Sequence, residues 1–255
     1  MIRVGSSLIG YKITAQDGDI GTVSDFLFDD TTWKLRWLVV DTGNWLPGRL
    51  VLVHPSAIGV PHDGRETLPV HLTQKQIEDS PDIASDRPVS RQMESTVYGY
   101  YGWDPMWGNG YFGPGMIGSP MSPPPLLDLE TSRAMEGAVL TDDHGDPHLR
   151  SITVVKGYDI QASDGGIGHV ANFLIDDASW QIRYLVADTS NWWFGRQVLI
   201  SPFAVRDIVW ADATINVAIS RDKVKTSPEW NPGELIDRAY QQQLHAHYQW
   251  PGYGW

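Results

Sequence analysis

The chain repeats itself, and this repeat restricts the folds open to it more than any other feature. When residues 10–58 are aligned with residues 157–205, an offset of 147, 27 of 49 pairs are identical without a gap. Self-similarity at a fixed offset is the signature of a duplicated domain. The match returns after the core, where the following residues recur at the same offset: Arg91 and Arg238, Tyr101 and Tyr248, Trp103 and Trp250. The 255 residues therefore hold two copies of one small domain.

Each copy has the pattern of short β-strands separated by turns. In the first copy the strand-like runs are 8–15, 20–28, 35–40, 50–53 and 68–72. Asp17-Gly18 is a hairpin signal, and the Asp and Thr residues of 29–32 favour a second turn. Thr73 is expected to cap a short helical turn that ends before Ser80-Pro81. Five or six short strands at this spacing predict a small barrel, whose closure removes exposed strand edges.

The predicted organisation is two barrels, each followed by a short helical tail. The first barrel covers 1–81, and a tail helix with a linker rich in Gly, Pro and aromatic residues covers 82–150. The second barrel covers 151–228 and a C-terminal helical tail 229–255. In that tail Asn231 is the expected N-cap, with Pro232 at the first helical position. A short helix predicted at 126–137 lies in the linker. We expect each unit to fold as its own barrel, and the two barrels to pack about a pseudo-twofold axis.

Composition removes several classes of function. The formal net charge of −12 disfavours nucleic-acid binding through the phosphate backbone. The absence of cysteine excludes disulfides, thiolate metal sites and a cysteine nucleophile. No apolar run reaches the ~18 residues of a membrane span, and Met1–Gly5 does not begin a secretory signal. These features predict an acidic cytoplasmic protein.

The ordered motifs resemble the PRC-barrel family. They are a Gly-Tyr pair, Asp-Gly-x-Ile-Gly-x-Val, an acidic turn before Trp33, Arg-aromatic-Leu-Val-x-Asp-Thr, and Gly-Arg-x-Val-Leu before Pro55; all recur in the second copy with conservative changes. This domain forms the cytoplasmic part of the photosynthetic reaction-centre H subunit and the C-terminal domain of the ribosome maturation factor RimM. The resemblance implies a compact barrel used as an adaptor or assembly surface, with a link to membrane-complex or photosynthetic-type assembly.

No catalytic motif is present, so we expect a protein that is not an enzyme and holds no cofactor or metal. The segment Asp142–His148 carries metal-ligand types but lacks the spacing of a calcium loop. A metal-dependent hydrolase using this segment is the alternative hypothesis, and an RNA-processing accessory protein is a weaker one. Asp29-Asp30 is interpreted as a turn, and His245-x-His247 as two exposed imidazoles. Arg36 and Arg183 are interpreted as structural partners of the repeat's carboxylates.

The turn before Gly-Arg in each copy is the predicted partner-binding region, because aromatics in a turn either plug a barrel end or contact a partner. The predicted function is that of a non-catalytic adaptor, whose partner is a protein that the sequence does not identify. The barrels are expected to pack on each other or to form a homodimer. The candidate binding residues are Trp45, Arg49, Trp192, Trp193 and Arg196.

Overall fold

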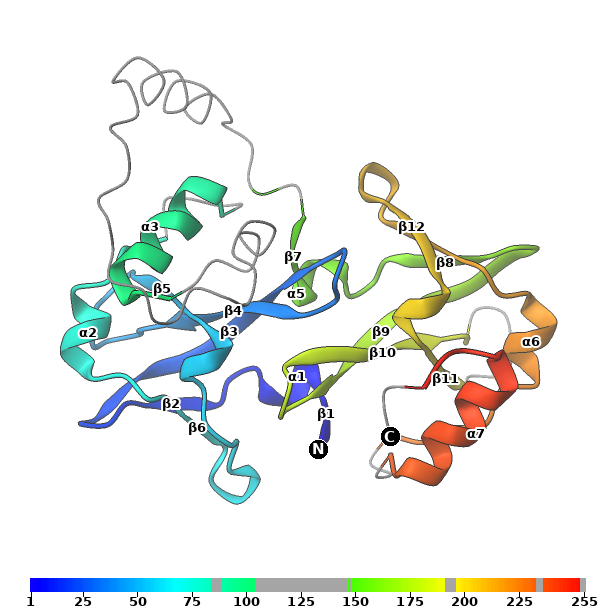
Figure 1. Cartoon of the computed structure of the whole chain (residues 1–255), viewed down its shortest axis with the longest axis horizontal. Coiled ribbons are helices and arrows are strands. Elements are labelled where there is room, and N and C mark those ends of the chain that lie inside the picture. The colour runs from blue at the N-terminus through cyan, green and yellow to red at the C-terminus, as the bar shows by residue number, and fades with distance from the viewer. Residues whose placement is uncertain (84–88, 104–145, 147, 191–195, 233–235, 253–255) are drawn as a thin grey trace, which may run out of the picture.

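The computed structural model describes residues 1–83, 89–103, 146, 148–190, 196–232 and 236–252. These residues are mainly β, with two sheets and a few short helices (Figure 1). Among them, no helix is both long enough and apolar enough to cross a membrane. The helix predicted at 126–137 lies outside the described residues.

The first sheet has the strand order β5-β4-β3-β2-β6, and β7 pairs with β3 off this path. Strand β4 lies between β3 and β5, which explains why its first six residues are all buried. The pairing of β2 with β6 is parallel. The elements of the first repeat are β1 Ile2–Val4, α1 Gly5–Leu8, β2 Lys12–Thr14, β3 Asp19–Asp29, β4 Leu35–Asp41, β5 Leu50–Val53, η1 Pro55–Ala57, η2 Asp63–Arg65, β6 Thr67–Pro69, α2 Gln74–Glu78 and α3 Arg91–Tyr101.

The second sheet has the order β11-β10-β9-β8-β13-β12, and β1 pairs with β9 off this path. The parallel pair is β8 with β13, at the place that β2 and β6 hold in the first sheet. The elements are β7 Leu149–Ser151, α5 Ile152–Val155, β8 Asp159–Ala162, β9 Gly165–Asp176, β10 Gln181–Asp188, β11 Gln197–Ile200, η3 Pro202–Ala204, β12 Val205–Val209, η4 Trp210–Asp212, β13 Thr214–Val217, α6 Arg221–Lys225 and α7 Arg238–Tyr248.

A glycine in the long strand of each repeat permits close approach of its neighbour. Gly21 in β3 has φ +144, and a Cβ there would lie 2.0 Å from the carbonyl oxygen of Asp41. Gly168 in β9 has φ +122, and a Cβ there would lie 1.8 Å from the carbonyl oxygen of Asp188. Only glycine fits at this crossing of the long strand and the end of the next one. The second glycine of the recurring Asp-Gly-x-Ile-Gly motif is therefore required by the close packing of these two strands.

The first strands of the two repeats are exchanged. Strand β1 pairs antiparallel with β9 of the second repeat, and β7, its counterpart at the offset of 147, pairs antiparallel with β3 of the first. The expectation that each repeat forms a barrel by itself is therefore wrong, because each sheet takes one strand from the other copy. The sequence does not show whether each first strand pairs within its own repeat or with the other one. The two repeats offer similar strand edges, so both pairings fit the same hydrophobic pattern.

The seam between the sheets is symmetric, as expected for a pseudo-twofold pair. The amide of Leu35 donates to the carbonyl of Trp180 at 2.8 Å, and the amide of Ile182 donates to the carbonyl of Trp33, also at 2.8 Å. Aromatic rings fill the space beneath: Phe26 packs against Trp180 with ring centroids 6.1 Å apart, and Phe28 and Phe173 lie 5.9 Å apart. One buried apolar cluster, with members such as Phe26, Phe28, Phe173 and Trp180, runs through both repeats.

The helices α3 and α7 each pack on their own repeat, at opposite ends of the molecule (Figure 1). They occupy equivalent positions, and each ends in a left-handed residue, Gly102 or Gln249. After each helix an aromatic pair stacks with centroids 4.1 Å apart, Tyr101 on Trp103 and Tyr248 on Trp250.

Some element boundaries differ from the sequence expectation. Leu8 ends the helical turn α1 and does not begin a strand, so the strand predicted at 8–15 is reduced to β2. The C-terminal helix begins at Arg238 with Asp237 as its N-cap, so the prediction of Asn231 as the cap is wrong. The Asp237 side chain accepts from the amide of Tyr240 at 2.7 Å. Thr73 caps α2 with a capping box, as its sequence predicts.

Candidate functional site

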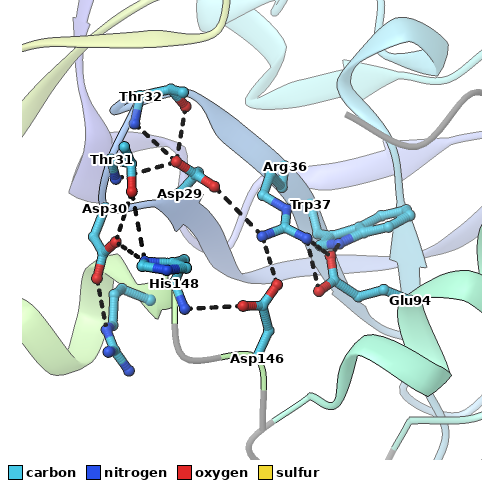
Figure 2. A network of polar contacts seen from close by, with 10 residues as sticks. Asp29, Asp30, Thr31, Thr32, Arg36, Trp37, Glu94, Asp146 and His148 are labelled. Atoms are coloured by element: carbon cyan, nitrogen blue, oxygen red, sulfur yellow. Dashed lines mark hydrogen bonds and ion pairs between the residues drawn. The ribbon is translucent and has the colours of Figure 1, made fainter. Parts of the chain in front are cut away.

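A buried guanidinium organises the most unusual polar cluster of the described residues. Arg36, on the buried strand β4, lies between three carboxylates (Figure 2). Its guanidinium nitrogens lie 2.7 Å from a carboxylate oxygen of Glu94, 2.8 Å from Asp146 and 3.5 Å from Asp29. The side chains of Glu94 and Asp146 are fully shielded from solvent, and that of Arg36 is 3% exposed. The indole of Trp37 also donates to Glu94.

Three separate segments bring these carboxylates to Arg36. Glu94 lies in the first turn of α3, whose N-cap Ser90 accepts from the amide of Met93 at 3.1 Å. Asp146 is held by the carbonyl of Val89, which accepts from its amide at 3.0 Å. Burial is the largest influence on Glu94 and raises its pKa to about 8, against the opposing effects of Arg36 and Trp37.

Asp29 and Asp30 act separately, as the turn interpretation requires. Asp29 accepts from the amides of Thr31 and Thr32 at 3.1 and 2.8 Å, which closes the turn. Asp30 turns the other way: one carboxylate oxygen lies 2.9 Å from Nδ1 of His148, and the other accepts from Nε of Arg150 at 3.3 Å (Figure 2). The two carboxylates therefore serve different neighbours and do not form an acid–base pair.

A groove of about 670 Å³ opens at the seam beside Asp30. One wall is the Asp30–Trp33 turn, the second is the exchanged strand β7 with His148 before it, and the third comes from the second repeat. The lining residues are Asp30, Thr31, Thr32, Trp33, His148, Arg150, Gln181, Pro202, Phe203, Val205, Arg206, Asp207, Ile208 and Trp210. Phe203 is 50% exposed, which places a large apolar ring at the surface of this groove.

Arg150 connects the walls of the groove. Its guanidinium carbon lies 3.8 Å from the ring centroid of Trp210, while its Nε donates to Asp30. The equivalent residue Arg3 makes a different pair on the other side of the seam, with Asp177 at 2.5 Å and with Asp63. Asp63 is the counterpart of Trp210. On one side of the seam Arg150 therefore stacks on the ring of Trp210, and at the equivalent place on the other side Arg3 forms an ion pair with Asp63.

Trp45, Arg49 and Arg196, the sequence-predicted binding residues that the structure describes, do not line this groove. Trp45 is half-buried against the apolar core. Arg49 donates to the carbonyls of Glu78 and Ser80 and so satisfies the end of α2. Arg196 is 44% exposed, with Nε 3.7 Å from a carboxylate oxygen of Glu229. Trp192 and Trp193 lie outside the described residues.

The segment Asp142–His148 is only partly described. Asp146 is buried on Arg36 and His148 contacts Asp30, so both ligand types are engaged within the protein. Among the residues that the structure describes, no three His, Asp or Glu side chains are placed to hold a metal ion. The expectation that His245 is an exposed imidazole is wrong. It is 3% exposed, with Nε2 3.0 Å from the hydroxyl of Tyr184.

Sequence reasoning missed Glu94, Arg150 and Trp210. The available signal was the set of differences between the copies: the counterpart of Glu94 is Gln241, and that of Trp210 is Asp63. The repeats agree where the fold requires it. Glu94 in the buried cluster and Phe203 and Trp210 in the groove are residues by which the copies differ, whereas Arg36 and Arg150 recur as Arg183 and Arg3.

Comparison with known proteins supports the domain type. Residues 4–71 match the model of the PRC-barrel domain. A further match is an uncharacterized protein of Deinococcus radiodurans, 33% identical over 89 residues. The aligned part is 34% of this chain and 32% of that protein, so the chain spans about a third of the length of the relative it matches.

Proposed function

We propose that this chain is a non-catalytic adaptor made of two PRC-type barrels in tandem, which binds a protein partner in the groove at their seam. The match to the PRC-barrel domain covers the first repeat. The proposal extends the same domain type to the second repeat, because its elements other than β12 follow in the same order at an offset of 147. Its parallel pair, exchanged strand and tail helix also correspond.

The main support for the proposal is that the walls of the groove come from three different parts of the chain. They come from the first repeat, the exchanged strand and the second repeat, so a ligand in the groove contacts all three. Its surface combines an exposed ring at Phe203, a stacked pair of Arg150 and Trp210, and the exposed side chain of Arg206. Aromatic and arginine side chains of this kind dominate the energy of protein–protein interfaces.

The polar groups of the groove support binding over chemistry. The carboxylates of Asp30 and Asp207 are engaged by His148 and Arg150 and by Asn216, at 2.6 to 3.3 Å. With Arg150 and Arg206 they give a groove of balanced charge on a chain whose formal net charge is −12. A partner is thus selected by shape and by aromatic contacts more than by net charge.

The test places a photo-crosslinking amino acid at Phe203 in cells and identifies what it captures. The matched control is the same amino acid at Ser56, the counterpart of Phe203, which is exposed but does not line the groove. The captured protein is then purified and titrated against the chain. Phe203→Ser, which gives the second repeat the residue of the first, should weaken binding about tenfold or more.

Capture at Ser56 equal to that at Phe203, or unchanged affinity in Phe203→Ser, would refute the groove as the binding site. The hydrolase hypothesis predicts instead a stoichiometric metal in the purified chain, which alanine at His144 and His148 would remove. Elemental analysis of the two preparations separates that hypothesis from the adaptor proposal.

A further inference from the structure

Glu94 and Asp146 lie on the two flanks of residues 104–145, a stretch that separates the two repeats in the sequence. Glu94 belongs to α3, which ends shortly before this stretch, and Asp146 follows directly after it. Both carboxylates meet the guanidinium of Arg36, at 2.7 and 2.8 Å. The backbone joins the same two segments, since the amide of Asp146 donates to the carbonyl of Val89 at 3.0 Å.

The charges of this cluster do not balance when all its members are ionised. One guanidinium faces Glu94, Asp146 and, at 3.5 Å, Asp29. Asp29 accepts further hydrogen bonds from its own turn, whereas the other two carboxyl groups contact each other in a site fully shielded from solvent. Two carboxylates in contact within such a site share a proton, because ionising both places like charges together in a poorly solvated environment.

Among the residues that the structure describes, the second repeat shows a different arrangement at the equivalent place. Gln241 replaces Glu94 there. Arg183, the counterpart of Arg36, pairs with Asp176 at 2.7 Å and is 17% exposed, against 3% for Arg36. The buried acidic cluster is thus a feature of the repeat that the 104–145 stretch follows, and is no requirement of the shared fold.

We propose that Glu94 and Asp146 share one proton beside Arg36. This proton holds the two flanks of residues 104–145 on strand β4. The contact of Glu94 and Asp146 with Arg36, here called the clasp, opens when the proton is lost. The clasp is a regulatory feature of the first repeat and does not depend on the adaptor role. Its opening would release α3 and the segment before β7 together. The same segment carries His148 to the edge of the groove, so the clasp adjoins the binding surface.

The groups that face the cluster come from β4, the end of β3, α3 and the segment before β7. They are Arg36 and Trp37 from β4, Asp29 from the end of β3, Tyr98 from α3, and His148, whose amide donates to Asp146 at 2.9 Å. His54 packs beside Trp37, with ring centroids 5.8 Å apart, and burial lowers its pKa to about 4, so it is neutral over this range. Burial first, then the contact with Asp146, raises the pKa of Glu94 to about 8, against an ordinary value of 4.5.

The direction of the pH effect follows from these values. Between pH 4.5 and about 8 the closed clasp holds a proton that the open form releases. The equilibrium constant for opening therefore rises with pH in this window, by up to tenfold per pH unit, and levels off above it. The closed form is the low-pH form.

Hydrogen exchange of the α3 backbone amides tests the clasp. In the wild-type protein, protection corrected for the chemical exchange rate should fall by up to tenfold per pH unit between about pH 6 and 8. In Glu94→Gln it should stay constant, because the amide keeps the shape of a protonated carboxyl and cannot lose a proton. Glu78→Gln, the same substitution at an exposed site away from the cluster, should behave as the wild type does.

Equal pH slopes in wild type and Glu94→Gln would overturn the proposal, as would a wild type whose α3 protection does not change with pH. The wild-type protein alone gives a second measurement, which applies even if the variant does not fold. Infrared spectroscopy should detect a buried protonated carboxyl group near pH 6 that disappears as the pH passes 8 to 9. Absence of that band near pH 6 would show that no proton is shared.

Discussion

Lys34 and Gln181, which hold the same position in the two repeats, form an antiparallel β-bridge with each other. The pseudo-twofold axis passes between two counterparts that pair with each other, so this bridge locates the axis of the molecule. The flanking hydrogen bonds, Leu35 to Trp180 and Ile182 to Trp33, are reciprocal about it. The duplicated chain is thus arranged as a homodimer would be, within one polypeptide.

The two equivalent arginines should differ in their contribution to stability. Arg36→Ala leaves Glu94 and Asp146 buried without their cation and should lower the free energy of unfolding by about 3–5 kcal/mol. Arg183→Ala removes a partly exposed pair with Asp176 and should lower it by about 1 kcal/mol or less. Denaturant unfolding of both variants at neutral pH measures the difference. Equal losses would show that burial of the cluster does not matter.

His54 should make the protein sensitive to acid. Burial lowers its pKa from 6.5 to about 4, so the unfolded chain binds a proton that the folded one does not. Stability from this residue is present above pH 6.5 and is lost as the pH falls toward 4, by up to about 1.4 kcal/mol per pH unit. His54→Ser should reduce this loss while keeping the cap of η1, since Ser201 caps η3 in the second repeat.

The measurement for His54 is the difference in unfolding free energy between the variant and the wild type as a function of pH. The wild-type curve by itself is not informative between pH 4.5 and 6.5, because Glu94 acts in the opposite direction there. A difference that does not vary below pH 6.5 would contradict the prediction.

The recurring glycines should tolerate no side chain. Gly21→Ala and Gly168→Ala each place a Cβ at about 2 Å from a carbonyl oxygen of the neighbouring strand, at a positive φ. Each should destabilise the protein by about 2 kcal/mol or more, because the strands must separate. Gly64→Ala is the control, since no atom lies within 4 Å of a Cβ there. If thermal unfolding shows the same loss of stability for Gly64→Ala as for the other two variants, the close approach of the strands at Gly21 and Gly168 is not what makes glycine necessary there.

The C-terminal helix should contribute to the stability of its repeat. Leu244 of α7 is fully buried, and Leu244→Ala should lower the free energy of unfolding by about 2–5 kcal/mol. Gln243→Ala changes the exposed neighbour and should have almost no effect. Deletion of residues 229–255 should lower the melting temperature and create binding sites for an apolar dye. An unchanged melting temperature after the deletion would mean that the tail does not belong to the folded unit.

The sequence was sufficient for the strands β3, β4 and β5, because their signals are local. Leu50–Val53 is β5 as predicted, and the apolar run at 35–40 lies within β4. The turn at Asp29 and the cap at Thr73 followed from side chains that bond their own backbone. The pseudo-twofold pairing was also predictable, from the duplication alone.

The exchange of β1 and β7 could not be predicted, because identical edges accept either strand. The buried cluster could not be predicted either. Its members Arg36, Glu94 and Asp146 come from three segments that are distant in the sequence, and no local pattern places them together. The groove could not be predicted for the same reason, because its lining residues Trp33 and Trp210 come from different repeats and meet only at the seam.

The exchanged strands also constrain how the protein is made on the ribosome. Strand β3 ends at Asp29, but the strand that covers its edge, β7, ends at Ser151. Strand β1 is the first to be synthesised, yet its partner β9 is complete only at Asp176. At a translation rate of roughly 5–20 residues per second, the edge of β3 stays uncovered for several seconds. An interrupted chain that ends between the repeats would keep that edge open, and is the form most exposed to aggregation and to removal by proteases.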